Sequence, residues 1–108
     1  MTNFKQLVES VLMENDYLNS ELYHRAKHAI EKHMNSGNKN SLHVIAGGQH
    51  LGHVVGKDKF GRGQVFDSYG NHHGFHETAK EAADKIMDFA KSKNVANSRN
   101  ILFTQSLD

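Results

Sequence analysis

The sequence predicts an α+β domain in which a small antiparallel sheet packs against two to three helices. Apolar residues recur at the helical spacing of three and four in the first third of the chain, and again from Ala79 to Ala90. Between these stretches, short apolar runs alternate with glycine-bearing turns, which is typical of strands. The resulting order of helix, helix, three strands, helix and strand favours an antiparallel sheet in a single domain spanning residues 1–108.

Two helices are expected before the sheet. The first covers residues 1–14, a segment that could be separable from the rest, and its apolar stripe is Phe4, Leu7, Val8, Val11 and Leu12. The second begins near Asn19 or Ser20 and ends in the turn-rich stretch 35–41. Its predicted inner face is made of Leu22, Ala26, Ala29, Ile30 and Met34.

The centre of the predicted sheet is a hairpin of strands 51–55 and 64–69, joined by the charged turn 57–63. Strands at 42–46 and 101–104 flank it. In the first of these, alternation places Val44 and Ala46 on one face and His43 with Ile45 on the other.

The strongest predicted helix runs from Thr78 to Lys93, after a polar loop over residues 70–77. Thr78 and Glu81 have the spacing of a capping box at its start. We expect this helix to pack Ala83, Ile86 and either Phe89 or Ala90 on the sheet.

The composition excludes several classes of function. The chain has no cysteine, so it can form no disulfide, thiolate zinc site or cysteine nucleophile, which fits a cytoplasmic location. Its net charge of +1, from 13 basic and 12 acidic residues, argues against nucleic acid as a partner. No apolar run reaches membrane-spanning length. We expect no cofactor, and oligomeric state is left open.

His50 and Asp67 are the candidate catalytic residues. His50 opens one predicted strand and Asp67 closes the next, so both would lie at one end of the hairpin, as a base and its orienting carboxylate do. Ser68 adjoins Asp67, but strand alternation points it to the opposite face. A plain polar pair across the strands is the alternative interpretation.

The hairpin resembles that of the adenain-like and SUMO-protease-like cysteine proteases. The residues that match are Gly48-Gln49-His50 and Phe66-Asp67-Ser68-Tyr69-Gly70. The resemblance implies that His50 is a general base and Asp67 its partner. Leu51 stands where that family has an aromatic residue, and the cysteine is absent. With these two departures, the resemblance implies a non-catalytic protein with a reduced protease-like fold that binds a protein partner, or one piece of a split protease.

The N-terminus resembles the targeting peptides of internal head proteins of T4-like phages. Such peptides are cut after Leu or Ile, any residue, then Glu, and Leu7-Val8-Glu9 and Leu12-Met13-Glu14 both fit. This implies a phage internal or anti-defence protein that inhibits a host enzyme, located in the virion interior or the host cytoplasm. We favour an ordinary amphipathic helix for this segment.

Nine histidines suggest possible metal ligands, and the weak candidates are His72, His73 and His76 in the predicted loop. His24 and His28, with Glu31 one turn on, form a second set. His50 and His53 would lie on opposite faces of a regular strand and could share a metal only across a bulge. Solvated surface histidines are the favoured interpretation, and a histidine-based metal enzyme is an alternative function.

The hairpin turn carries Lys57, Lys59 and Arg62 around Phe60. These residues could contact phosphates and stack on a base. A charged turn that keeps the tip of the hairpin in water is the favoured interpretation.

Overall fold

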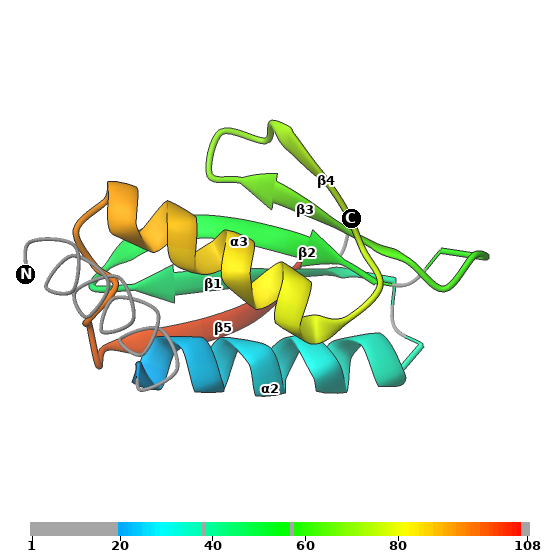
Figure 1. Cartoon of the computed structure of the whole chain (residues 1–108), viewed down its shortest axis with the longest axis horizontal. Coiled ribbons are helices and arrows are strands. Elements are labelled where there is room, and N and C mark those ends of the chain that lie inside the picture. Colours follow the sequence, from blue (N-terminus) through cyan, green and yellow to red (C-terminus); the bar gives the residue numbers. More distant parts are fainter. Residues whose placement is uncertain (1–19, 38, 57, 107–108) are drawn as a thin grey trace, which may run out of the picture.

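The computed structural model describes residues 20–37, 39–56 and 58–106. Within these residues it contains two helices and five strands (Figure 1). They are α2 (Glu21–Asn35), β1 (Ser41–Ala46), β2 (Gln49–Val55), β3 (Gly63–Asp67), β4 (His72–His76), α3 (Ala79–Ser92) and β5 (Ile101–Ser106). The α+β class is confirmed. The helix expected over residues 1–14 lies outside the described residues.

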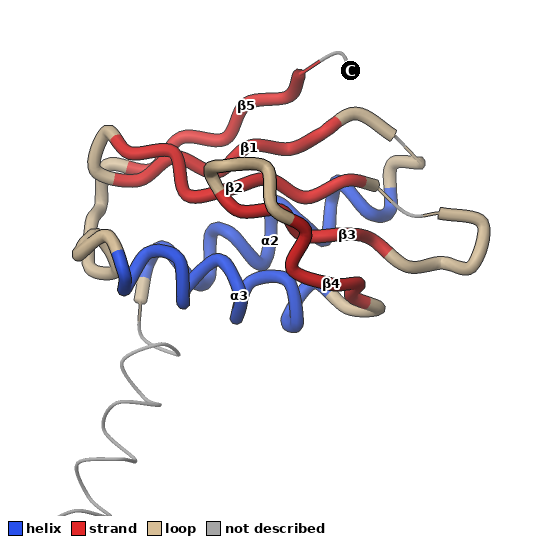
Figure 2. Tube along the Cα trace, turned by 90° about the horizontal axis from the view of Figure 1, so that it is seen from above, coloured by secondary structure: helices blue, strands red, loops and turns tan. Residues whose placement is uncertain are grey.

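The five strands form one antiparallel sheet in the order β4-β3-β2-β1-β5. Both helices lie on the same side of this sheet, so the fold has two layers (Figure 2). We call the side that carries α2 and α3 the covered face and the other side the open face. In the part of the chain that is described, no helix lies over the open face.

Helix α2 begins where the sequence placed it. The Ser20 side chain accepts a hydrogen bond from the backbone N–H of Tyr23 and donates one to the carbonyl of Ala96, which ties the helix start to the loop before β5. This N-cap satisfies a backbone donor that would otherwise lack a partner. Of the predicted inner face, Leu22, Ala26, Ile30 and Met34 are buried in the core, and Ala29 is half-buried beside it.

Helix α3 is also capped as the sequence predicts. The Thr78 hydroxyl accepts from the N–H of Glu81, and the Glu81 carboxylate accepts from the N–H of Glu77. Ala83, Ile86 and Ala90 are fully buried, whereas Phe89 is half-buried at the edge of the core. Because alanines leave little bulk between backbones, α3 can approach both α2 and the sheet closely.

The four predicted strands are all present, with β2 beginning two residues earlier and β5 ending two residues later than expected, and two larger differences concern β3 and β4. The predicted loop 70–77 contains a strand, β4, which pairs with β3. In addition, β3 ends at Asp67, two residues earlier than expected, because Ser68 and Tyr69 form a turn. The Asp67 carboxylate closes that turn by accepting from the N–H groups of Tyr69 and Asn71. Side chains that compete for backbone partners in this way favour turns over strands.

Candidate functional site

A row of aromatic rings crosses the open face from β1 to β4. Its members, which we call the ring row, are His50, His43, His53, Phe66, His72 and Phe75. Neighbouring rings lie with their centroids 4.8–5.2 Å apart, and the rings of His53 and Phe66 are stacked at an interplanar angle of 10°. The guanidinium of Arg62 lies 4.4 Å from the ring centre of Phe75 at the far end. These distances are those of favourable aromatic and cation–π contacts.

A β-bulge brings two of these histidines to the same face. Val44 pairs with Gly52, but the next residue, Ile45, pairs with His50, so Leu51 is an extra residue in β2. The extra residue reverses the alternation, and His50 and His53 therefore both lie on the open face. The expectation that these two side chains point to opposite faces is wrong for this reason. His43 lies directly across from His53 in the same register.

His43, His50 and His53 consequently form a compact cluster, which we call the three-histidine cluster. The Nδ1 atom of His43 lies 2.9 Å from the Nε2 atom of His50, a hydrogen bond between two imidazoles. One ring nitrogen of each of the three residues falls within 4.8 Å of the others. All three are half-buried. Burial lowers the pKa of His50, and the nearby His43 and Lys93 lower it further.

Asp67 does not pair with His50. In the register Asp67 is opposite Gly52, which puts it on the covered face, whereas His50 is on the open face. The Asp67 carboxylate lies instead 2.9 Å from the Nε2 atom of His73. Partial burial would raise the pKa of Asp67, but hydrogen bonds from His73, Asn71 and Tyr69 outweigh it and hold that pKa well below its usual range.

The geometric prediction of a base and orienting acid at one end of the hairpin is therefore wrong. An imidazole paired with a carboxylate would have a raised pKa, whereas burial lowers the pKa of His50. The bulge is the physical reason, because it turns His50 away from the face that Asp67 occupies. Ser68 lies in the turn after β3 rather than on a strand.

The other predicted metal candidates, His72, His73 and His76, all belong to β4, and this strand directs their side chains to different places. His72 lies in the ring row, while His73 lies near the covered face, with its ring 4.8 Å from that of Phe89. His76 is 1% exposed, beneath Gly63, where a Cβ atom would collide with its imidazole ring. Among the described residues, the only group of three or more histidine or acidic side chains close enough to share an ion is the three-histidine cluster. His24 and His28, the second candidate set, are exposed on α2.

The turn between β2 and β3 is organised around Asp58, whose carboxylate accepts from the N–H groups of Phe60 and Arg62. The Lys59 ammonium and the Arg62 guanidinium both lie 5.2 Å from the ring centre of Phe60. Arg62 thus contacts two aromatic rings, Phe60 in the turn and Phe75 in the ring row. Lys57 of the predicted basic cluster lies outside the described residues.

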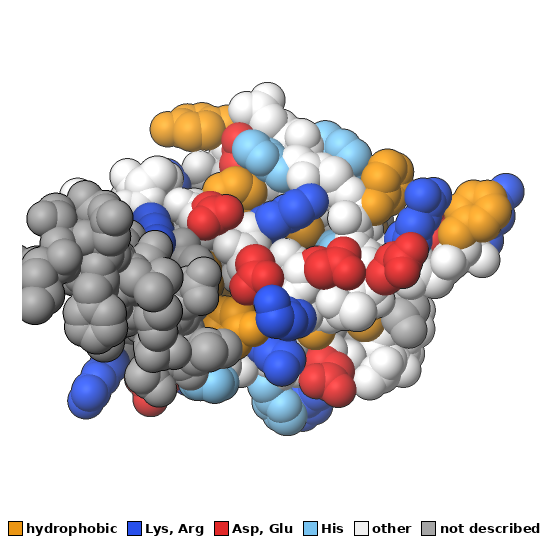
Figure 3. Space-filling view, viewed as in Figure 1, with side chains coloured by type: hydrophobic (Ala, Val, Ile, Leu, Met, Phe, Trp, Pro, Cys, Tyr) orange, Lys and Arg blue, Asp and Glu red, His pale blue; other side chains and the backbone are white. Residues whose placement is uncertain are grey.

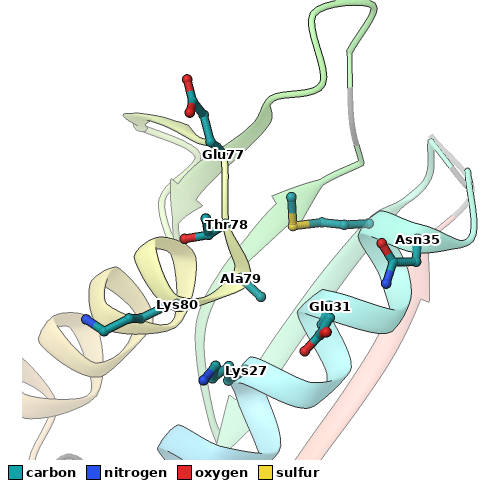
Figure 4. A pocket seen from close by; sticks show the side chains of 8 residues that line it. Lys27, Glu31, Asn35, Glu77, Thr78, Ala79 and Lys80 are labelled. Carbon is teal, nitrogen blue, oxygen red and sulfur yellow. The ribbon is translucent and has the colours of Figure 1, made fainter.

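A groove also lies between the end of α2 and the start of α3. Figure 4 shows that Ala79 points into the groove, while Glu77 and Lys80 extend away from it. Lys80 is engaged with Asp84 at 3.1 Å. The lining charges are of both signs and do not converge on one point, so the groove does not have the character of a ligand site.

Comparison of the chain with protein-family models, with curated proteins and with solved structures found no match. None of the described helices combines the length and the apolar character needed to cross a membrane.

Proposed function

We propose that this is a non-catalytic binding protein. Its open face binds a segment of a protein partner, and that segment contains both apolar and acidic residues. The observation that carries the proposal is the chemistry of the open face. A solvent-facing side of an antiparallel sheet is normally polar. Here it carries the ring row together with the exposed aliphatic side chain of Leu102.

The apolar part of this surface is substantial. Phe75 is 46% exposed and Leu102 is 54% exposed, at opposite ends of the sheet. Ile45 lies across from Leu102 in the register and extends the aliphatic half. Exposed apolar side chains that gather on one face are typical of interaction surfaces.

The charge of the open face selects the kind of partner. In the described strands, no acidic residue occupies a position on this face. Arg62 of the adjoining turn lies at one end, over Phe75, and its guanidinium is 3.5 Å from the Asp58 carboxylate of the same turn. By contrast, Figure 3 shows side chains of both charges mixed over the helices. A partner with carboxylates beside its apolar residues complements the open face.

Stacked rings also suit single-stranded nucleic acid, but phosphate contacts dominate the affinity of such complexes. Among the described lysines and arginines, Arg62 is the one whose charged group lies against a phenyl ring of the ring row. We therefore favour a protein segment, and the experiment below separates the two ligands.

The test is a selection from a library of random peptides displayed on phage, with the purified protein as bait. We expect enriched peptides that combine Asp or Glu with apolar residues. A synthetic copy of one such peptide should bind, and Leu102→Asp or Phe75→Asp should weaken its binding about tenfold, which corresponds to about 1.4 kcal/mol.

Tyr69→Asp is the matched control, because Tyr69 is 85% exposed but lies in the β3–β4 turn, near Lys93 rather than on the open face. It should leave peptide binding unchanged. The proposal is overturned if no enriched peptide is sensitive to the open-face changes. It is also overturned if an oligothymidylate binds instead and loses affinity in the same variants.

A narrower version of this function follows from the resemblance of the N-terminus to phage targeting peptides. In that version the protein is packaged in a virion and inhibits a host enzyme after delivery. Mass spectrometry of particles would then find a mature N-terminus at Ser10 or Asn15. If the chain in particles is unprocessed, or if particles do not contain the protein, the phage version is wrong. The proposal that the open face binds a protein partner is not affected by either result.

A further inference from the structure

The geometry points to a second property of the open face: we propose that the three-histidine cluster is a binding site for a divalent transition metal of the zinc class. The inference is independent of the proposed protein partner. It rests on the spacing of the ring nitrogens, on the bulge that brings them together and on the contacts that orient the rings.

The spacing is close to that of a metal site. Zinc binds imidazole nitrogen at about 2.0–2.1 Å, so two ligands of a tetrahedral site lie about 3.3 Å apart. The nitrogens of His43 and His50 are 2.9 Å apart, and the third ligand, from His53, lies within 4.8 Å. The nitrogens of His43 and His50 thus already lie near the required distance, and zinc would draw the His53 nitrogen towards them.

The ligands are held by rigid elements rather than by a loop. His43 is in β1, while His50 and His53 are in β2 on either side of the bulge. The ring of His53 is fixed from the other side by stacking on Phe66. Bulges often occur next to functional sites because they re-aim a side chain. Here the bulge supplies a ligand that a regular strand would direct into the core.

The chemistry of binding requires no other residue. In the hydrogen bond between His43 and His50, one nitrogen carries a proton and the other accepts it. For a metal to bind both facing nitrogens, the donor imidazole changes tautomer: its single proton leaves the facing nitrogen and, by exchange with water, its other ring nitrogen takes one up, so both imidazoles stay neutral. Three neutral imidazoles suit zinc, copper or nickel, whereas magnesium and calcium need oxygen ligands.

Three protein ligands leave a fourth tetrahedral position. Because the three histidines are half-buried on a face that no described helix covers, this position is accessible to water or to a side chain of a partner. Sites with three protein ligands and one open position differ from closed structural sites in this respect.

The test is titration of the full chain with zinc chloride, followed by isothermal calorimetry and by the imidazole nitrogen shifts in NMR spectra of the wild-type protein. We expect one zinc ion per chain. The shifts should change at His43, His50 and His53 and remain in place at the other histidines. Magnesium should produce neither effect.

Single changes of His43, His50 or His53 to Gln should each weaken zinc binding by at least about tenfold. His72→Gln is the matched control, because His72 lies in the same ring row but outside the cluster, and it should bind zinc like the wild type. If zinc produces no shift at these three residues, or if the His72 variant loses binding equally, the proposal is wrong. The NMR readout needs no variant, so a folding defect cannot disguise the answer. Peptide binding plays no part in it, so the two proposals fail separately.

Discussion

The covered and open faces of the same sheet are built on different principles. On the covered face, Leu51, Val54 and Val65 are fully buried against helices rich in alanine. The close approach of these helices to the sheet determines which side chains fit between them. On the open face, side chains contact one another across the strands through ring stacking and hydrogen bonds. The covered face thus stabilises the fold through buried apolar packing, while the side chains of the open face are held by contacts with one another.

The largest expected effect is a loss of stability, which should differ between one residue of the covered face and one residue of the open face. Ile86→Ala removes a fully buried side chain from the covered face and should lower the free energy of unfolding by about 2–5 kcal/mol. Leu102→Ala on the open face should change it by less than about 0.5 kcal/mol. Urea unfolding followed by circular dichroism measures both. Equal losses would mean that the open face is covered in solution.

A smaller effect tests how tightly the covered face is packed around β3. Gly63→Ala places a Cβ atom against the His76 ring and 3.0 Å from the carbonyl oxygen of Val55, which should cost about 1–3 kcal/mol of stability. The neighbouring Gln64→Ala, half-buried on the open side, should cost less than about 0.5 kcal/mol. If Gly63→Ala is as stable as the wild type, the strand and the ring can separate at little cost.

The buried histidine should make the covered face sensitive to acid. Burial lowers the pKa of His76 below its ordinary value of 6.5, although the Thr78 backbone and the Glu81 carboxylate oppose the shift and Lys85 adds to it. The folded protein therefore holds this proton less tightly than the unfolded chain. The stability contributed by neutral His76 is complete above about pH 6.5 and falls as the pH drops from there to the folded pKa.

His76→Gln is the comparison for this prediction, because it cannot titrate. Unfolding curves at a series of pH values should show a steeper loss for the wild type than for the variant between neutral and mildly acidic pH. Parallel curves would show that other groups account for the acid sensitivity.

The smallest predicted effect lies within the ring row. The stacked pair of His53 and Phe66 should contribute about 0.5–1 kcal/mol beyond its buried area. A double-mutant cycle with both residues changed to alanine, measured in the presence of a chelator, isolates this coupling. A coupling of zero would mean that the rings are neighbours without mutual stabilisation.

Much of the fold could be predicted from the sequence, because long apolar stripes and caps leave clear patterns. The start of α2 at Ser20, the Thr78 cap of α3 and the buried face of α3 are found as expected, although the Glu81 carboxylate bonds to the N–H of Glu77 and not to that of Thr78. Strand β4 could not be predicted, since its sequence His-His-Gly-Phe-His has no alternating apolar pattern. Its histidines owe their places to pairing with β3 rather than to local preference.

A single residue accounts for the difference between the predicted and the observed site. Strict alternation predicts that His50 and His53 lie on opposite faces and that His50 lies on the side of Asp67, whereas the extra residue Leu51 reverses both. A signal of the bulge was nevertheless present, because Leu51 and Val54 are both apolar and only three positions apart. Both are buried, which a regular strand does not allow. A break in the apolar alternation therefore marks the bulge.

The extra residue Leu51 makes the register of β2, and not only residue identity, a condition for the cluster. Six residues separate His43 from His50, and two separate His50 from His53. With this spacing, His50 and His53 share the open face only through the bulge at Leu51; a regular strand over the same residues would keep every histidine but direct His50 to the covered face. The spacing His-x6-His-x2-His, with an apolar residue directly after the second histidine and another directly after the third, is thus a signature by which the same arrangement can be recognised in other sequences.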